Sequence, residues 1–347
     1  MKCILASKFG DISEVLTMST EWPKPMLDPK GGQMLVRVEA CSLCRGDTIF
    51  LSGALSKVLQ PPAFPCIPGM GVCGVVEEIE EGGKFKVGDR VIAANGMLPV
   101  GGLAEYMAVG TKNAALAPAA MDVVQAAALP NSPSSAVACT RAAGVKAGDR
   151  VLVLGGSGGV GCSLVQLLRD AGASFVAATS TAAPLMKSLS VDLVIDYRTT
   201  KWWEMPEIIE QPFDIVVDCV GWRDEWKAAA RTGALKSGRK GGRYLAVATT
   251  NEPKFTTIFE GLRMFVPVLW RVCWTMLYPW VPRYKFVMCT PVEADFLEAV
   301  KLVEENRLKV VIEPASPFPF TCHGAKQAFE LQASKHAHGA VVIKVAE

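Results

Sequence analysis

Hydrophobic and polar residues follow two different patterns along the chain. In the first third they alternate in short runs, as in residues 34–40, and glycines and prolines separate the runs. This alternation predicts short, half-buried strands. After residue 149, short runs that are apolar at nearly every position alternate with helical patterns, which predicts a parallel sheet covered on both faces. The strands of that sheet are expected at residues 150–154, 175–179, 193–195, 213–220 and 243–248.

The change of pattern divides the chain into segments. Residues 1–122 are predicted to form a small β-rich domain, and residues 123–289 a doubly wound α/β domain. Residues 290–347 begin with a helix signal, in which Thr290 and Glu293 form a capping box around a proline, and end in strand-like runs. We therefore expect this last segment to return to the first domain.

A glycine-rich turn follows the predicted strand at 150–154. Gly156, Gly158 and Gly161 fill the G-x-G-x-x-G frame, in which glycines permit a tight turn, close approach of the backbone to a pyrophosphate, and close packing of helix on strand. The helix after the turn would offer free N–H groups and its positive dipole end to phosphate. The context favours a dinucleotide site over a purely structural turn.

The end of the next predicted strand bears on which dinucleotide binds. An NAD site usually carries Asp or Glu about 20 residues after the glycine turn, but this chain has Thr179, Ser180 and Thr181 there. Ser180 and Thr181 can donate hydrogen bonds, and Lys187 follows on the next predicted helix, so NADPH is favoured over NADH. The alternative for Lys187 is an ordinary solvated helix residue.

Composition excludes several classes of protein. The chain has 36 Lys and Arg against 34 Asp and Glu, so its net charge of +2 gives no reason to expect nucleic acid as a partner. Its 11 cysteines are irregularly spaced, which favours reduced thiols and a cytoplasmic protein. Residues 1–10 lack the apolar run of a signal peptide, although an organelle location after removal of a targeting peptide stays open.

An ordered set of motifs resembles one known family. The segments SLCRGD, IPGMGVCGVV, KVGDRV, GGLAEYMAV, GVKAGDRVLVLGGSGGVG, VIDYR, FDIVVDCVG and HAHGAVVIKV occur in the order of the medium-chain dehydrogenase/reductase superfamily and cover essentially the whole chain. They are similar to its zinc-free quinone oxidoreductase and enoyl reductase branch, and the later segments resemble the reticulon-4-interacting protein subgroup. The resemblance implies a GroES-like β-rich domain beside a Rossmann domain, with the active site between them.

The resemblance also implies which residues hold the cofactor, NADPH. Those at the pyrophosphate are Gly156, Ser157, Gly158, Gly159 and Val160. Those at the 2′-phosphate are Ser180, Lys187 and Tyr197, and those along the nicotinamide are Val220, Val247, Ala248 and Thr249.

A metal site is not expected. Zinc-containing members use a Cys, a His and a third ligand. Here Cys44 stands at the first position but Met70 stands where the His would be, and the three histidines all fall near the C-terminus. A zinc alcohol dehydrogenase is therefore a weaker alternative. A four-cysteine site has unsuitable spacing, and its candidates are Cys41, Cys44, Cys66 and Cys73.

The expected reaction is zinc-independent hydride transfer from NADPH to a quinone or an α,β-unsaturated carbonyl compound. The branch often has Asn and Tyr where this chain has Cys44 and Ile49. Arg45 and Thr48 are further candidates for a proton donor, but no catalytic residue is assigned, and the sequence gives no reason for Gly71, where an acidic residue is usual. The alternative function is a catalytically weak NADPH-binding scaffold or sensor.

Aromatic and basic residues gather in residues 255–286. This segment could line a cleft for a lipophilic substrate, form the surface of a homodimer, or make peripheral contact with a membrane. Within it, the apolar stretch at residues 264–280 is interrupted by Arg271, Pro267 and Pro279 and falls short of the ~20 apolar residues of a membrane span. A small-molecule substrate and a homodimer are the expected partners.

Overall fold

The structure is a computed structural model that describes residues 1–28, 32–57, 60–61, 63–80, 83–98, 100–221, 225–247, 255–290 and 292–346. The chain forms two compact units. Unit 1 comprises Met1–Ser135 and Thr290–Glu347, and unit 2 comprises Ala136–Cys289. The sequence placed the first boundary at residue 122. The structure places it after Ser135 because helix α3 (Val123–Ala128) packs against strands β3 and β4 of unit 1.

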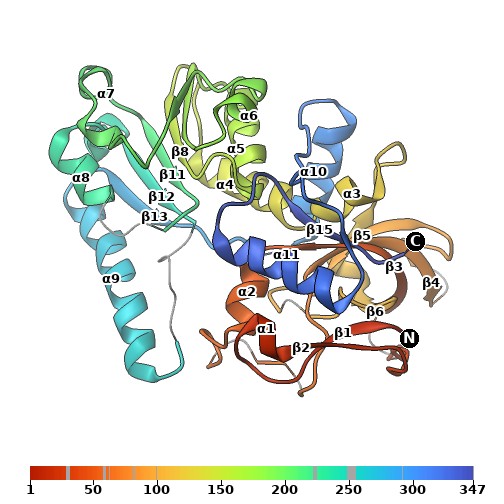
Figure 1. Cartoon of the computed structure of the whole chain (residues 1–347). Helices are drawn as coiled ribbons and strands as arrows, with labels where there is room; N and C mark the ends of the chain where they lie inside the picture. The colour runs from red at the N-terminus through yellow and green to blue at the C-terminus, as the bar shows by residue number, and fades with distance from the viewer. Residues whose placement is uncertain are drawn as a thin grey trace. The chain divides into compact units, whose positions relative to one another are not determined.

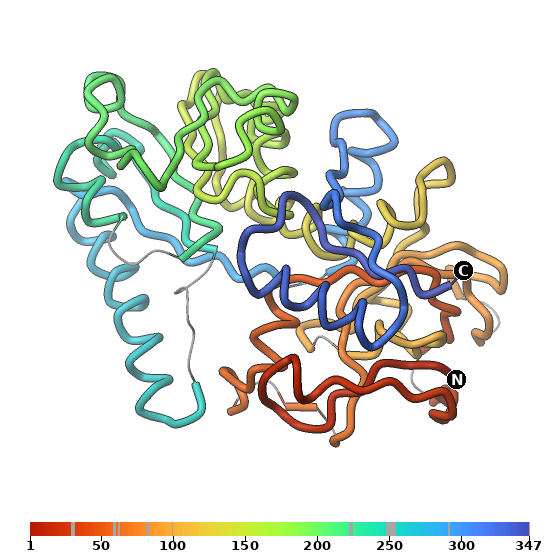
Figure 2. Tube along the Cα trace, viewed as in Figure 1, coloured from red at the N-terminus to blue at the C-terminus, as the bar shows by residue number. Residues whose placement is uncertain are grey.

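Unit 1 is built on a sheet of seven strands in the order β14-β15-β3-β4-β5-β7, with β6 also paired to β3. The pairing is antiparallel except between β14 and β15, which are parallel. The C-terminal strand β15 pairs with β3, so the last segment returns to the first one as predicted (Figure 2). The strands of unit 1 are β1 (Cys3–Ala6), β2 (Leu16–Ser19), β3 (Gln33–Leu43), β4 (Gly71–Ile79), β5 (Arg90–Ala94), β6 (Tyr106–Gly110), β7 (Ala114–Leu116), β14 (Phe318–Pro319) and β15 (Val341–Lys344), of which β1 and β2 form a separate two-stranded sheet. Its helices, besides α3, are α1 (Ile12–Val15), α2 (Arg45–Leu51), η1 (Thr111–Asn113), α10 (Glu293–Glu304) and α11 (Cys322–Ser334), and α4 (Ser132–Ala143) continues into unit 2.

Unit 2 contains a parallel sheet of six strands in the order β10-β9-β8-β11-β12-β13. Numbered within the unit, this order is 3-2-1-4-5-6, that of a Rossmann domain. The strands are β8 (Arg150–Leu154), β9 (Phe175–Thr179), β10 (Leu193–Ile195), β11 (Ile215–Asp218), β12 (Arg243–Ala246) and β13 (Arg283–Phe286). The helices are α5 (Gly159–Asp170), α6 (Ala183–Ser188), η2 (Trp202–Glu204), α7 (Pro206–Glu210), α8 (Glu225–Thr232), η3 (Gly238–Lys240) and α9 (Ile258–Leu277).

Helices cover both faces of this sheet. In Figure 1, α5 and α6 lie on one side of the strands and α8 and α9 on the other. The central strands β8 and β11 are apolar at nearly every position and are almost wholly buried, because each needs an apolar surface on both faces. The predicted fold class, a GroES-like β-rich domain with a Rossmann domain, is confirmed.

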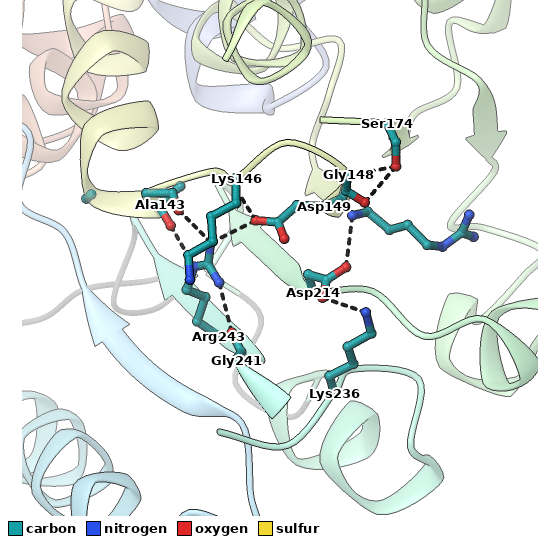
Figure 3. A network of polar contacts seen from close by, with 12 residues as sticks. Ala143, Lys146, Gly148, Asp149, Ser174, Asp214, Lys236, Gly241 and Arg243 are labelled. Atoms are coloured by element: carbon teal, nitrogen blue, oxygen red, sulfur yellow. Dashed lines mark hydrogen bonds and ion pairs between the residues drawn. The ribbon is translucent and has the colours of Figure 1, made fainter. Parts of the chain in front are cut away.

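A polar network fixes the amino-terminal edge of the parallel sheet (Figure 3). Arg243, at the start of β12, donates hydrogen bonds to the carbonyls of Ala143 and Gly241 and pairs with Asp149 at 2.9 Å. Asp214 pairs with Lys236 at 2.6 Å and accepts the Arg150 N–H at 3.0 Å. These ion pairs stabilise the starts of the strands, so Lys236 and Arg243 have structural roles.

Candidate functional site

The glycine turn has the predicted strand, turn and helix context, with β8 leading into α5. Gly155 makes the tight turn, since its φ is +78°. A Cβ on Gly156 would lie 2.5 Å from the Ala178 Cβ, so Gly156 allows close contact with β9. A Cβ on Gly161 would lie 2.2 Å from the Gly155 carbonyl oxygen, so the third frame position permits helix and turn to pack closely, as expected.

The first turn of α5 offers backbone donors. Gly158 is the N-cap and makes no side-chain cap, and the N–H groups of Gly159 and Val160 lie in the first turn, where a helix provides no partner. Ser157 precedes them and is 8% exposed. This arrangement can bind the oxygen atoms of a phosphate, because aligned N–H groups and the helix dipole both favour an anion.

Thr179 holds the turn in place and was overlooked by the sequence reasoning, which considered only the charge at this position. The Gly155 N–H donates to the Thr179 hydroxyl at 2.9 Å, and the Gly156 N–H donates to the Thr179 carbonyl at 3.0 Å. The next residue, Ser180, is buried, and its hydroxyl accepts the Ala182 N–H at 2.9 Å. A hydroxyl that accepts this bond can still donate one.

Tyr197 and Lys187 come from elements next to Ser180. The Ser180 N–H donates to the Ile195 carbonyl at 3.0 Å, so the ends of β9 and β10 are adjacent, and Tyr197 follows β10. Lys187 is exposed on α6, the helix after β9. The structure therefore brings all three predicted 2′-phosphate residues to neighbouring elements.

An acidic residue that was not considered in the sequence, Asp196, directly follows β10. Its carboxylate accepts hydrogen bonds from the Arg198 backbone N–H at 3.0 Å and from the Arg198 side chain, the shortest of which come from Nε at 2.9 Å and Nη2 at 2.5 Å. These bonds lower the pKa of Asp196 to about 2. The carboxylate therefore stays ionised and is locally neutralised by its partner.

Val220 and Val247 follow the next two strands, β11 and β12. Val220 lies against the turn, because a Cβ on Gly155 would come within 2.8 Å of its Cγ2. The Val247 N–H donates to the Asp218 carbonyl at 2.9 Å. Ala248 and Thr249, the other two residues expected along the nicotinamide, lie outside the described residues.

Asp218 sets the position of Val220. Its carboxylate accepts the N–H groups of Val220 and Gly221 at 2.9 and 2.8 Å and the hydroxyl of Tyr244 at 2.8 Å. The strand predicted over 213–220 therefore ends at Asp218, because this side chain turns the following backbone. The signal in the sequence is an aspartate that closes a wholly apolar run.

In unit 1, the residues at the position used for zinc in the family make contacts with one another. The Cys44 thiol lies 3.7 Å from the Met70 sulfur, and the Cys44 N–H donates to the buried Asp47 carboxylate at 2.7 Å. Burial raises the pKa of Asp47 to about 7. Across the described ranges, no three His, Cys, Asp or Glu side chains gather as metal ligands, and the alternative four-cysteine set does not form such a group.

The structure accounts for Gly71. A Cβ at this position would lie 2.8 Å from the Ser42 hydroxyl and 2.9 Å from the Asn131 amide nitrogen. The Asn131 amide donates to the Ser42 hydroxyl at 2.8 Å, and both side chains are buried. An acidic side chain at Gly71 would displace this pair, so the substitution fits its surroundings.

The candidate proton donors remain without an assigned role. The Thr48 hydroxyl donates to the Arg45 carbonyl at 2.9 Å, which is a contact within the first turn of α2. Cys44 and Ile49 are partly buried. Nothing in their contacts marks one of them as the acid of a reaction.

Comparison with known proteins agrees with this fold. The Alcohol dehydrogenase GroES-like domain family matches residues 30–119, and the Zinc-binding dehydrogenase family matches residues 189–343. The chain is 30% identical to the chloroplastic NADPH-dependent alkenal/one oxidoreductase of Arabidopsis thaliana, over 99% of this chain and 79% of that protein. It is 29% identical to the mitochondrial NAD(P)H oxidoreductase RTN4IP1 of Drosophila melanogaster, over 98% and 85%.

Among solved structures, the quinone oxidoreductase from Coxiella burnetii is similar, with a TM-score of 0.77, 25% identity and 99% of each chain covered. The Rossmann strand order, the glycine turn and these full-length similarities lead to one conclusion. The chain belongs to the medium-chain dehydrogenase/reductase superfamily of oxidoreductases.

Proposed function

We propose that this protein is a zinc-independent, NADPH-dependent oxidoreductase that transfers a hydride to a quinone or an α,β-unsaturated carbonyl compound. The observation that carries the proposal is the row of candidate residues along the carboxyl edge of the parallel sheet. In strand order, Tyr197 follows β10, Ser180 follows β9, the glycine turn follows β8, Val220 follows β11 and Val247 follows β12. This order corresponds to the order of groups in NADPH, from the 2′-phosphate through the pyrophosphate to the nicotinamide.

The residues present fit this cofactor. The first turn of α5 has backbone donors and a glycine N-cap for the pyrophosphate. The end of β9 carries Ser180 rather than a carboxylate that would repel a 2′-phosphate, and the adjacent Asp196 is paired with Arg198. The similarity to the chloroplastic NADPH-dependent alkenal/one oxidoreductase of Arabidopsis thaliana supports the same cofactor.

Bound NADPH would supply the hydride, and the protein would supply position and polarity. The backbone donors of Gly159 and Val160 would bind the pyrophosphate, while Ser180, Lys187 and Tyr197 would bind the adenosine phosphate. Val220 and Val247 would present apolar surface on the nicotinamide side, and Asp218 would position Val220 through its bonds to the backbone.

The test is oxidation of NADPH and of NADH by the purified protein with a panel of quinones, enones and enoyl thioesters. We expect turnover with NADPH at least about ten-fold more efficient than with NADH, and no stoichiometric zinc by elemental analysis. Turnover that requires zinc, or an equal preference for NADH, would refute the corresponding part of the proposal.

A second candidate function, an NADPH-binding scaffold or sensor, rests on the contacts near α2. Cys44 contacts Met70 and the Thr48 hydroxyl bonds to its own helix, so neither presents an acid committed to a substrate. Tight NADPH binding with background turnover across the whole panel would favour this candidate. The cytoplasmic location and the homodimer stay predictions.

A further inference from the structure

Helix α9 exposes an unusually apolar surface. More than half of the large apolar side chains that are exposed in the described part of the chain lie in residues 258–280. Phe259 is 84% exposed, Leu269 64% and Trp270 66%. Exposed positions recur at steps of three and four residues, so they form a continuous stripe along the helix. Contiguous apolar surface of this kind marks a site of interaction.

The opposite face of α9 already has a partner. Val268 and Thr275 are buried, and the second half of the helix packs on β13 and on the core of unit 2. The half that begins at Ile258 projects beyond the strands of its own unit in Figure 1. The exposed stripe is therefore not the face that holds the helix to the protein, and its composition is not required by the core.

Basic residues accompany the stripe. From residue 255 to residue 286 the sequence has 4 Lys and Arg against 1 Asp or Glu. At the end of α9, Trp280 is 66% exposed, and the guanidinium of Arg239 lies 5.7 Å from its ring centroid. Lys240 and Arg263 are exposed as well. The Glu260 carboxylate accepts N–H groups at the first turn of the helix, and it is the one acidic side chain in the sequence of α9, which also contains Arg263 and Arg271.

We propose that the exposed stripe of α9 binds the surface of a membrane that contains anionic lipid. Aromatic side chains beside Arg and Lys are typical of helices that lie in the interface of a bilayer, where the rings enter the acyl boundary and the cations meet lipid phosphates. The positive excess selects an anionic surface, and the projecting helix gives lipid access to its apolar side chains. The binding is peripheral. No helix in the described ranges is both long enough and apolar enough to cross a bilayer.

The test is flotation of the full-length protein with vesicles of phosphatidylcholine alone and of phosphatidylcholine with phosphatidylglycerol. We expect binding to the anionic vesicles only, weakened by salt. The double variant Leu269→Ser with Trp270→Ser should weaken binding about ten-fold or more, because two apolar side chains no longer enter the bilayer. Arg239→Gln with Lys240→Gln should weaken it at least about five-fold.

The matched control removes equally exposed apolar groups elsewhere. Met26 is 92% exposed and Val87 62%, both in unit 1, so Met26→Ser with Val87→Ser should bind vesicles like the parent. The proposal would be overturned if the Leu269→Ser, Trp270→Ser variant and the control bound anionic vesicles equally well. It would also be overturned if the parent protein did not bind anionic vesicles, or bound neutral vesicles equally well. Sedimentation velocity provides the remaining comparison. If the parent does not bind vesicles, and the α9 variant converts a dimer to a monomer, the stripe is a subunit interface instead.

Discussion

Glu225 predicts a pH dependence of stability that can be isolated by one substitution. Its side chain is 5% exposed at the start of α8, and burial raises the pKa of the carboxyl to about 8 from 4.5. The Trp202 indole N–H donates to this carboxyl at 2.8 Å and opposes the rise, while the nearby Asp218 adds to it. The folded protein therefore keeps a proton on Glu225 at neutral pH.

The sign follows from the two pKa values. Between pH 4.5 and about 8 the unfolded chain loses this proton and the folded protein retains it. The stabilisation linked to Glu225 is therefore fully present below pH 4.5 and is lost as the pH rises towards about 8. At 1.36 kcal/mol per pKa unit, a rise from 4.5 to about 8 corresponds to at most about 5 kcal/mol.

The perturbation is Glu225→Gln, which removes the titrating proton and keeps an oxygen that can accept the Trp202 N–H. The matched control is Glu204→Gln, because Glu204 lies in the same unit with 57% of its side chain exposed. The assay is urea unfolding followed by tryptophan fluorescence from about pH 5 to about pH 9. Subtracting the parent from each variant cancels the other titrating groups, including Asp47.

The free energy of unfolding of Glu225→Gln, relative to the parent, should rise by about 2 to 5 kcal/mol across this pH range. The relative stability of Glu204→Gln should stay constant. Parallel curves for the parent and Glu225→Gln would refute the reasoning, because they would mean that this carboxyl is ionised in the folded protein.

Three further predictions concern the two edges of the parallel sheet. Ser180→Asp should weaken NADPH binding about ten-fold or more in a fluorescence titration and leave NADH binding unchanged, since the carboxylate repels only the 2′-phosphate. Equal weakening of the binding of both cofactors would contradict this prediction. Gly156→Val should abolish tight NADPH binding, because a Cβ at this position would lie 2.5 Å from the Ala178 Cβ. The control Gly83→Val should bind NADPH normally, because the nearest atom to its Cβ would be 3.9 Å away. Tight NADPH binding by Gly156→Val would contradict this prediction. Arg243→Met should lower the free energy of unfolding by about 3 kcal/mol, because it removes the ion-pair partner of Asp149. The Kd for NADPH should not change. A loss of cofactor affinity in the folded variant would show that the two edges of the sheet are not independent.

The sequence predicted the parallel sheet because fully apolar runs leave few alternatives. The strands expected at 150–154, 175–179 and 193–195 are those observed. The end of β11 was predicted two residues too late, because hydropathy alone did not take into account that the Asp218 carboxylate captures the N–H groups two and three residues further along. The boundary near Ser135 was missed for a different reason, since the packing of α3 on unit 1 leaves no mark in composition.

The sequence predicted some features of the candidate site and missed others. Glycine spacing identified the turn, but it could not show that Gly155 adopts the positive φ or that Thr179 binds the turn. The aromatic segment was recognised from composition alone, which does not distinguish a buried helix from an exposed one. The structure resolves that ambiguity for α9, because exposure depends on which neighbours cover the helix.

The separation of the cofactor residues and the polar network on opposite edges of one sheet has a consequence for protein engineering. Each strand joins the two edges through a buried apolar run, so a residue substituted at one edge has no side-chain contact in common with a residue at the other. The effects of such distant substitutions on the free energy of unfolding are therefore expected to add. Cofactor preference can therefore be redesigned around Ser180 while stability is improved separately around Asp214 and Arg243. Libraries for the two traits can be screened in parallel and then combined.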